Sequence, residues 1–182
     1  MKIKVVSKDI RGGGKFLNWF WYYLNDGRIY EVYSRKKNPN PKECDAVDIA
    51  AFNDDRSKVC VIMEYRPAVE DTIMAFPAGL CEAGEGIYET AQRELWEECG
   101  LHMVSILKGL QASYQSPGMS DESCATVFCV AAGDITNAHN TDDEEIHPMW
   151  ISKEEAREYL KSGQPISARC QMFLAMWSGY FD

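Results

Sequence analysis

Three glutamates, Glu94, Glu97 and Glu98, follow Arg93 in close succession. On a helix, positions i, i+3 and i+4 share one face, so the three carboxylates would converge on one small volume. Carboxylates that close repel one another and raise one another's pKa unless a positive charge lies among them. Mg²⁺ meets this requirement with oxygen ligands and keeps several waters that a phosphate can replace. Spacing alone leaves a second interpretation open, a solvated acidic helix face.

These carboxylates belong to a longer pattern of fixed residues. It consists of Gly79, Glu85, Arg93-Glu94-Leu95, Glu97-Glu98 and Gly100-Leu101. The pattern resembles the Nudix box, the motif of hydrolases that cleave nucleoside diphosphates linked to another moiety, and it matches at every specified position. The resemblance favours a metal site over a solvated acidic face.

The resemblance also implies how the metal is held. Glu94, Glu97 and Glu98 are expected to be ligands, together with the backbone carbonyl of Ala78. Mg²⁺ is the expected cofactor, with Mn²⁺ as an alternative. Glu98 and Arg93 are grouped with the catalytic residues, although we expect Arg93 to pair with a carboxylate of the box rather than contact substrate.

Three residues of the box are expected to act structurally: Gly79, Glu85 and Gly100. Glu85 is expected to brace the loop and the helix start, where a negative charge is favourable. Gly100 can end the helix in the left-handed conformation. An apolar stripe repeats every four residues and predicts the buried helix face, with the carboxylates on a flank open to solvent; its members are Ile87, Ala91 and Leu95.

The elements from Asp45 onward fit the Nudix fold, an α/β/α sandwich of the α+β class with a mixed sheet between helices. An N-terminal antiparallel β-hairpin region, 1–44, precedes the catalytic domain, 45–182. Strands are expected at 1–10, 15–24, 28–37, 45–53, 58–66, 102–112, 126–132 and 147–151. Helices are expected at 86–98, at 152–161 and after Ser167. The remaining segments, including 11–14, 70–73, 79–84, 113–122 and 133–146, are expected to be loops.

Composition narrows the classes of partner. A hydrophobic fraction of 46% is ample for a core, and the net charge of −9 argues against a nucleic-acid polymer. The sequence has no run of 18 apolar residues and no signal-peptide core at its N-terminus, so no membrane partner is expected. Its seven cysteines include no CxxC pair, which favours reduced, mostly buried thiols in a cytoplasmic protein.

Features outside the box are similar to the ADP-ribose pyrophosphatases of the family. Pro117 follows Leu101 by sixteen residues, and the segment 116–122 is similar to their SPGxSxE loop. Their N-terminal hairpin is exchanged between two subunits. The resemblance therefore implies a homodimer that hydrolyses the pyrophosphate of ADP-ribose to AMP and ribose 5-phosphate.

Candidate substrate-binding residues follow from the same loop and from phosphate chemistry. They are Arg35, Arg66, Pro117, Gly118, Ser120, Glu122 and Trp19. Arginine binds phosphate through two parallel hydrogen bonds, but Arg35 and Arg66 could equally form structural ion pairs. Trp19 could stack on a nucleobase or pack within its own domain or on a second subunit.

A general base is expected from the loop that holds Asp142, Asp143, Glu144 and Glu145. Glu144 is the first candidate and Glu145 the second, while full solvation of all four carboxylates remains an alternative. Two other functions stay open. One is a pyrophosphatase for another nucleoside diphosphate sugar such as GDP-mannose, and the other is a sensor that binds a nucleotide without cleaving it.

Overall fold

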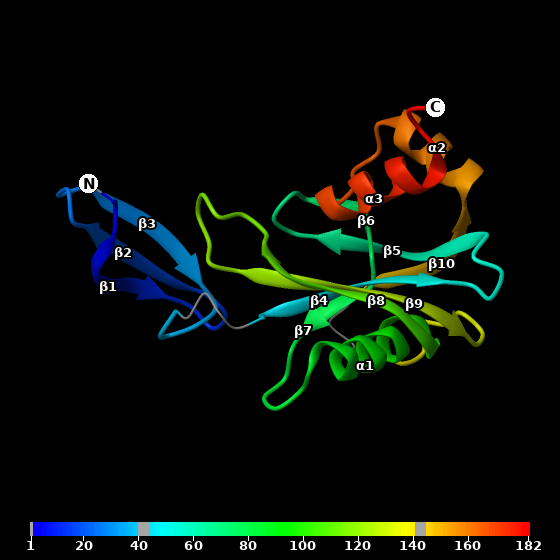
Figure 1. Cartoon of the computed structure of the whole chain (residues 1–182), viewed down its shortest axis with the longest axis horizontal. Coiled ribbons are helices and arrows are strands. Elements are labelled where there is room, and N and C mark those ends of the chain that lie inside the picture. The colour runs from blue at the N-terminus through cyan, green and yellow to red at the C-terminus, as the bar shows by residue number, and fades with distance from the viewer. Residues whose placement is uncertain (1, 40–43, 141–144) are drawn as a thin grey trace. The chain divides into compact units, whose positions relative to one another are not determined.

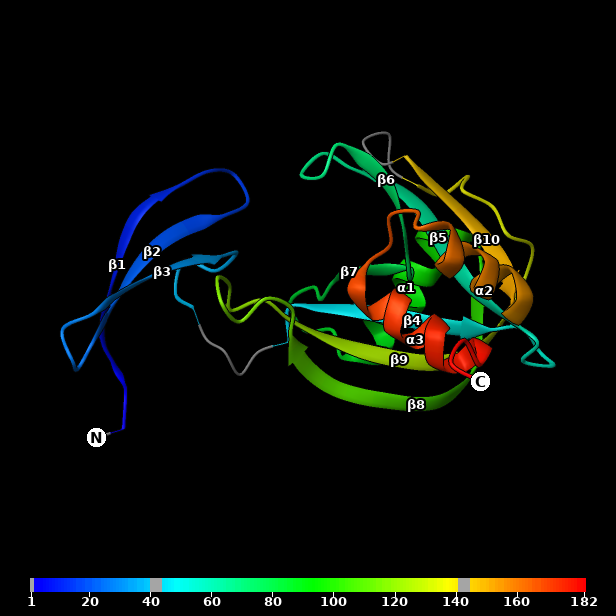
Figure 2. The same cartoon turned by 90° about the horizontal axis from the view of Figure 1, so that it is seen from above.

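The computed structural model describes residues 2–39, 44–140 and 145–182, which form two compact units (Figures 1 and 2). The first unit comprises Met1–Asp45 and Ala112–Cys124, and the second comprises Ala46–Gln111 and Ala125–Asp182. The first unit thus contains a segment from the middle of the chain as well as the N-terminal region.

The first unit is built on an antiparallel sheet with the strand order β1-β2-β3. Its strands are β1 (Val5–Gly13), β2 (Asn18–Leu24) and β3 (Ile29–Ser34). The flexible break predicted at 11–14 is wrong, because β1 continues to Gly13 and its last glycines pair with Trp19 and Asn18 of β2. The run of glycines was interpreted as a break, but a glycine can also lie within a strand, where it lets the neighbouring backbone and side chains approach closely.

A small core and two long-range bonds hold this unit together. Phe20 and Val32 are buried register partners on β2 and β3. The Tyr33 N–H donates to the carbonyl of Met119 at 2.8 Å, and the Tyr30 hydroxyl donates to the carbonyl of Gly118 at 2.7 Å. The loop that the sequence singled out at 116–122 is therefore attached to β3.

In the described part of the chain, seven strands form a second sheet, which is mixed as predicted. Its order is β10-β5-β4-β9-β8, with β6 paired to β5 and β7 paired to β4. The strands are β4 (Ala46–Phe52), β5 (Lys58–Arg66), β6 (Asp71–Ala75), β7 (Ala78–Leu80), β8 (His102–Tyr114), β9 (Ser123–Ala132) and β10 (Ile146–Ser152).

Two of these strands correct the sequence expectations. The loop predicted at 70–73 is largely β6, which runs antiparallel to β5. The loop predicted at 79–84 begins as β7, whose Ala78 and Gly79 pair with Asp48 and Val47 of β4. Both strands are short, and Pro77 stands between them, so local propensity gave no strand signal.

Helices cover both faces of the sheet, as the predicted sandwich requires (Figure 1). Helix α1 (Ile87–Cys99) lies on one face, and α2 (Lys153–Ser162) and α3 (Ala168–Ser178) lie on the other. Side chains alternate along β4, so Ala50 and Phe52 join the core under α2 and α3 while Ile49 points towards α1. Asp48 therefore points to the α3 face.

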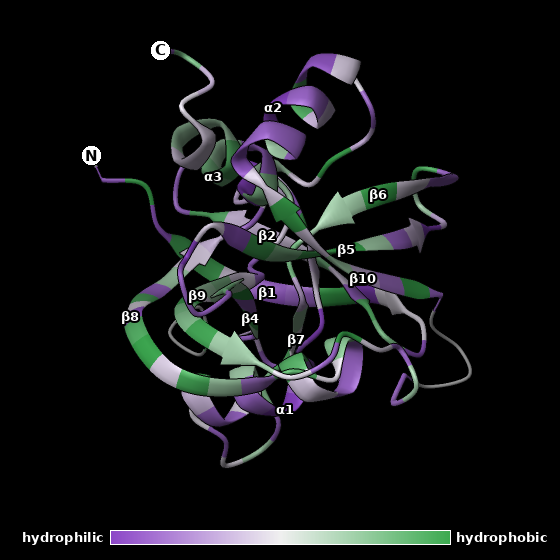
Figure 3. Ribbon diagram, turned by 90° about the vertical axis from the view of Figure 1, so that its right-hand side faces the viewer, coloured by the Kyte–Doolittle hydropathy of each residue, from purple (hydrophilic) through white to green (hydrophobic). Residues whose placement is uncertain are grey.

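The helix boundaries follow local capping chemistry. Gly100 and Gly163 end α1 and α2 with φ of 69° and 72°, the left-handed conformation that glycine adopts readily. Ser152 and Glu155 form a reciprocal capping box at the start of α2. Helix α2 is largely hydrophilic along its length (Figure 3), consistent with a surface helix that buries Ala156 alone.

Most of the cysteines are buried thiols, as the sequence predicted. Five of the seven cysteines are buried, namely Cys60, Cys99, Cys124, Cys129 and Cys170. No helix within the described residues is long and apolar enough to cross a membrane.

Candidate active site

The first contact of the candidate site joins β7 to α1. The backbone N–H of Ala78 donates to Oε2 of Glu98 at 2.9 Å. Glu98 is only 7% exposed. Burial raises the pKa of the Glu98 carboxyl, and the nearby carboxylates of Glu94 and Glu64 act in the same direction, whereas the Ala78 bond opposes them.

Arg93 is the positive charge among the carboxylates. Its Nε and Nη2 donate to the two oxygens of Glu85 at 3.0 Å each, and Nη2 also donates to the carbonyl of Leu80 at 3.0 Å. Its Nη1 donates to Glu94 at 2.7 Å and to Glu97 at 3.1 Å. All five N–H donors of the guanidinium are therefore used, and Arg93 joins the loop before α1 to the acidic face of the helix.

Glu85 ties the loop to the helix start. Besides the Arg93 bonds, its Oε2 accepts from the Thr90 hydroxyl at 2.9 Å and from the Glu82 N–H at 3.2 Å. The Arg93 guanidinium is the main cause that lowers the pKa of Glu85 to about 2. Glu85 is thus an ionised acceptor that fixes the turn ahead of α1.

Gly79 makes room for Glu94. A Cβ atom at Gly79 would lie 1.8 Å from Cδ of Glu94 and would overlap its carboxylate. The side chain of Glu94 is mostly buried, whereas that of Glu97 is 47% exposed. The absence of a side chain at Gly79 allows the Glu94 carboxylate to pass directly against the backbone of β7.

One expectation about the helix face is wrong. Glu98 does not lie on an open flank, because it follows Ala91 by seven residues and Leu95 by three, and both of these are fully buried. At 3.6 residues per turn those spacings place Glu98 on the buried side. Ile87, the first residue of the predicted stripe, is only half-buried.

The donor chemistry of this group fits Mg²⁺. Carboxylate oxygens of Glu94, Glu97 and Glu98 and the backbone of Ala78 are brought to one end of α1, and oxygen atoms are the preferred ligands of Mg²⁺. Within residues 2–39, 44–140 and 145–182, no three His, Cys, Asp or Glu side chains already converge as a metal site. Arg93 Nη1 donates hydrogen bonds to Glu94 and Glu97, so these carboxylates must exchange those hydrogen bonds for the cation when it binds.

Glu64 is a nearby carboxylate that the sequence did not indicate. It lies on β5 two residues after the buried Ile62, and alternation along the strand places both on the α1 face. Glu64 pairs with Arg66 at 2.7 Å. A single carboxylate at the end of an apolar strand was the available signal. Arg66 thus forms the structural ion pair that was the alternative to phosphate binding, and contact between Arg66 and substrate stays a prediction.

The acidic loop after β9 is only partly described. Asp142, Asp143 and Glu144, which include the first candidate for the general base, lie outside the described residues. Glu145 is exposed, and its Oε1 lies 3.7 Å from Nε2 of His147. The general base therefore stays a prediction.

Aromatic stacking and side-chain hydrogen bonds hold residues 137–140, which precede the acidic residues of this loop. The Trp96 ring of α1 stacks between the rings of His102 and His139, with centroid separations of 4.4 and 4.3 Å. The side-chain amides of Asn137 and Asn140 both donate to the carbonyl of Ile146, at 3.4 and 3.3 Å. The sequence gave these histidines no function, because stacking partners have no characteristic spacing.

The other predicted substrate residues belong to the first unit. Arg35 Nε donates to Glu122 Oε1 at 2.8 Å, and the Glu122 N–H donates to the Ser120 hydroxyl at 3.0 Å. Pro117 is exposed in the same loop. Trp19 is half-buried on β2, and its indole N–H is buried with no partner among the described residues. The structure therefore groups Arg35, Ser120 and Glu122.

Comparison with known proteins points in one direction. A family model described as NUDIX domain matches residues 42–170. The chain is 30% identical over 167 residues to the ADP-ribose pyrophosphatase of Bacillus subtilis (strain 168), across 91% of this chain and 87% of that protein. It is 31% identical over 127 residues to the ADP-ribose pyrophosphatase of Escherichia coli (strain K12), across 65% and 60% of the two chains. It is also 31% identical over 117 residues to the methanol dehydrogenase activator of Bacillus methanolicus, across 64% and 62%.

We expect Gly79→Ala to displace the Glu94 carboxylate and weaken divalent-cation binding by about tenfold or more, the scale of disturbing groups that orient a ligand. Titration with Mn²⁺, followed by the EPR signal of the free ion, measures this affinity. Gly14→Ala is the control, because a Cβ there meets no atom within 4 Å. Unchanged Mn²⁺ affinity in Gly79→Ala would contradict the assignment of Glu94 as a ligand.

We expect Glu85→Gln to lower the free energy of unfolding of the metal-free protein near neutral pH. The folded-state pKa of Glu85 is about 2 against an ordinary value of 4.5, so its contribution is complete above pH 4.5 and is lost as the pH falls towards 2. Urea unfolding in EDTA, near pH 7 and near pH 3, should show the difference from wild type shrinking at the lower pH. Glu89→Gln removes a first-turn carboxylate outside the Arg93 network and is the control. An equal deficit at both pH values would count against the ion pair.

Proposed function

The chain belongs to the Nudix family of hydrolases, and we propose that it hydrolyses the pyrophosphate bond of ADP-ribose to AMP and ribose 5-phosphate. The observation that carries this proposal is the extent of the match to the B. subtilis ADP-ribose pyrophosphatase. That match covers 91% of the chain, whereas the family model covers residues 42–170. The similarity therefore includes much of the region outside the family domain, where substrate preference is expected to reside.

The proposed metal site uses the acidic end of α1. Glu94, Glu97, Glu98 and the Ala78 carbonyl would hold Mg²⁺, with Mn²⁺ as an alternative. Bound Mg²⁺ neutralises phosphate oxygens and so lowers the barrier to attack by water on a polyanion. Arg93 keeps its bonds to Glu85 and Leu80, and these hold the loop against the helix while the carboxylates turn to the cation.

The remaining steps are assigned to residues outside the box. Glu144, with Glu145 as second candidate, removes a proton from the attacking water as the bond between the two phosphates breaks. Arg35 and Arg66 bind phosphate oxygens, and the loop containing Pro117, Gly118, Ser120 and Glu122 contacts the rest of the substrate. Trp19 is the candidate for stacking on the base.

A substrate panel tests the reaction. Wild-type protein is incubated with Mg²⁺ and either ADP-ribose or GDP-mannose, and the release of AMP or GMP is quantified. We expect AMP release from ADP-ribose to dominate. Preferential GMP release would overturn the proposed substrate, and the absence of any turnover would favour a non-catalytic sensor.

For Glu98→Gln we expect ADP-ribose binding to survive while Mg²⁺-dependent hydrolysis falls by about 100-fold or more, the scale of losing one group that stabilises the transition state. Binding is measured by calorimetry and hydrolysis by AMP release. Glu154→Gln removes an exposed carboxylate of α2 that pairs with Arg157, and we expect it to retain full activity. Wild-type activity in Glu98→Gln would remove Glu98 from the metal site.

We further propose that the protein is a cytoplasmic homodimer whose first unit forms the interface. Every residue of β1 is exposed, including Val5, Val6 and Ile10, and an exposed edge strand with apolar side chains invites pairing. We expect light scattering to give twice the chain mass of 20.7 kDa. Ile10→Lys should shift the mass towards the monomer, whereas Met176→Lys on α3 should not. A monomeric wild-type protein would refute the dimer.

A further inference from the structure

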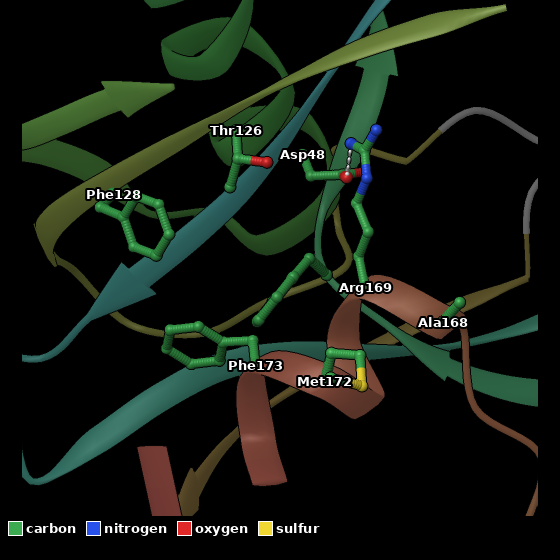
Figure 4. A pocket seen from close by; sticks show the side chains of 8 residues that line it. Asp48, Thr126, Phe128, Ala168, Arg169, Met172 and Phe173 are labelled. Carbon is green, nitrogen blue, oxygen red and sulfur yellow. Dashed lines mark hydrogen bonds and ion pairs between the residues drawn. The ribbon is translucent and has the colours of Figure 1, made fainter. Parts of the chain in front are cut away.

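The second unit contains a cavity of about 360 Å³ between α3 and the sheet (Figure 4). Its walls are mainly apolar, and its one polar end is formed by Asp48, Thr126 and Arg169. The apolar wall is formed by Phe76, Phe128, Ala168, Met172 and Phe173. A cavity of a few hundred Å³, lined by aromatic side chains with a few convergent polar groups, has the anatomy of a small-molecule site.

The aromatic wall favours a flat ligand. The Phe173 ring meets Phe76 at a centroid separation of 5.2 Å and an angle of 71°, and meets Phe128 at 5.8 Å and 43°. Planar molecules gain from offset and edge contacts with such rings beyond the area they bury. The thioether of Met172 adds a polarisable surface that adapts to ring shape.

The polar end favours nitrogen atoms in that flat ligand. Arg169 and Asp48 form an ion pair whose side chains are only 23% and 16% exposed. The Thr126 hydroxyl lies beside them and can donate or accept (Figure 4). Acceptor and donor groups therefore stand next to each other, which suits a ring carrying both an N–H and an unprotonated nitrogen.

We propose that this cavity is a second ligand site, separate from the carboxylates of α1, for a small planar heteroaromatic molecule. Asp48 faces the same side of β4 as Ala50 and Phe52, which pack under α3, whereas α1 lies on the opposite face of the sheet (Figure 1). The molecule that occupies it is distinct from the substrate whose pyrophosphate meets α1.

The two faces are nevertheless joined through shared backbone. Asp48 is the register partner of Ala78, and Phe76 precedes Ala78 by two residues. The Ala78 N–H in turn holds Glu98. An occupant of the cavity thus contacts Asp48, the β4 partner of Ala78, and Phe76, two residues before it, so the cavity has the location expected of an effector site.

Benzimidazole is a suitable probe because its bicyclic ring carries one N–H and one acceptor nitrogen. We expect saturable binding to one site by calorimetry in EDTA, and weaker binding of indane, a hydrocarbon of similar shape. Thr126→Val keeps the side-chain shape and should weaken binding about fivefold, the value of one hydrogen bond. Ala168→Phe should obstruct the cavity and abolish binding, whereas Met176→Phe, on the same helix and 73% exposed in the wild type, should not.

Several outcomes would overturn the proposal. These are an absence of saturable binding, equal affinity in wild type and Ala168→Phe, or indane binding as tightly as benzimidazole. Displacement of benzimidazole by ADP-ribose in EDTA would place the cavity within the substrate site and refute its separateness. The test contains no hydrolysis step, so its result does not depend on the proposed reaction.

Discussion

The hydrogen bonds of Arg93 are the interaction on which the rest of the site depends. A helix face that carries Glu94 and Glu97 beside a buried Glu98 would destabilise itself through like-charge repulsion. The guanidinium offsets that repulsion, and its remaining N–H groups donate to Glu85 and the Leu80 carbonyl. The same side chain therefore makes the acidic helix tolerable and fixes the loop that leads into it.

A second constraint is the backbone of β7. This three-residue strand carries Ala78, whose N–H binds Glu98, and Gly79, which leaves space for Glu94. It also pairs with β4 at Asp48, whose side chain reaches the opposite face of the sheet. This short strand thus contacts the carboxylates of α1 and is linked to the cavity under α3 through its register partner Asp48, which is the route by which an occupant of the cavity would shift Ala78.

The sequence predicted those parts of the fold that depend on local chemistry. The glycine that ends α1 is a local signal and lies where it was expected, and α2 lies within one residue of the helix predicted at 152–161. Strand β7 was missed because its hydrogen bonds come from β4, which is distant in sequence. Strand β6 was missed because it is short and is defined by its pairing with β5. The Trp96 stack and the proximity of Glu64 to Glu98 depend on tertiary contacts in the same way, so no spacing indicates them.

Charge is the remaining constraint on a chain with a net charge of −9 whose proposed substrate is a polyanion. Arg93 stays bound to Glu85 and to the Leu80 carbonyl, so phosphate recognition is assigned to other cations. Arg35 and Arg66 are 42% and 52% exposed and pair with Glu122 and Glu64. Exposed ion pairs contribute only about 0–1 kcal/mol. A phosphate that accepts two bonds from Arg35 can therefore replace Glu122, which is 31% exposed, at little cost, and that ion pair then serves as a resting arrangement of a binding residue. Glu64 is only 13% exposed, so separating it from Arg66 costs more.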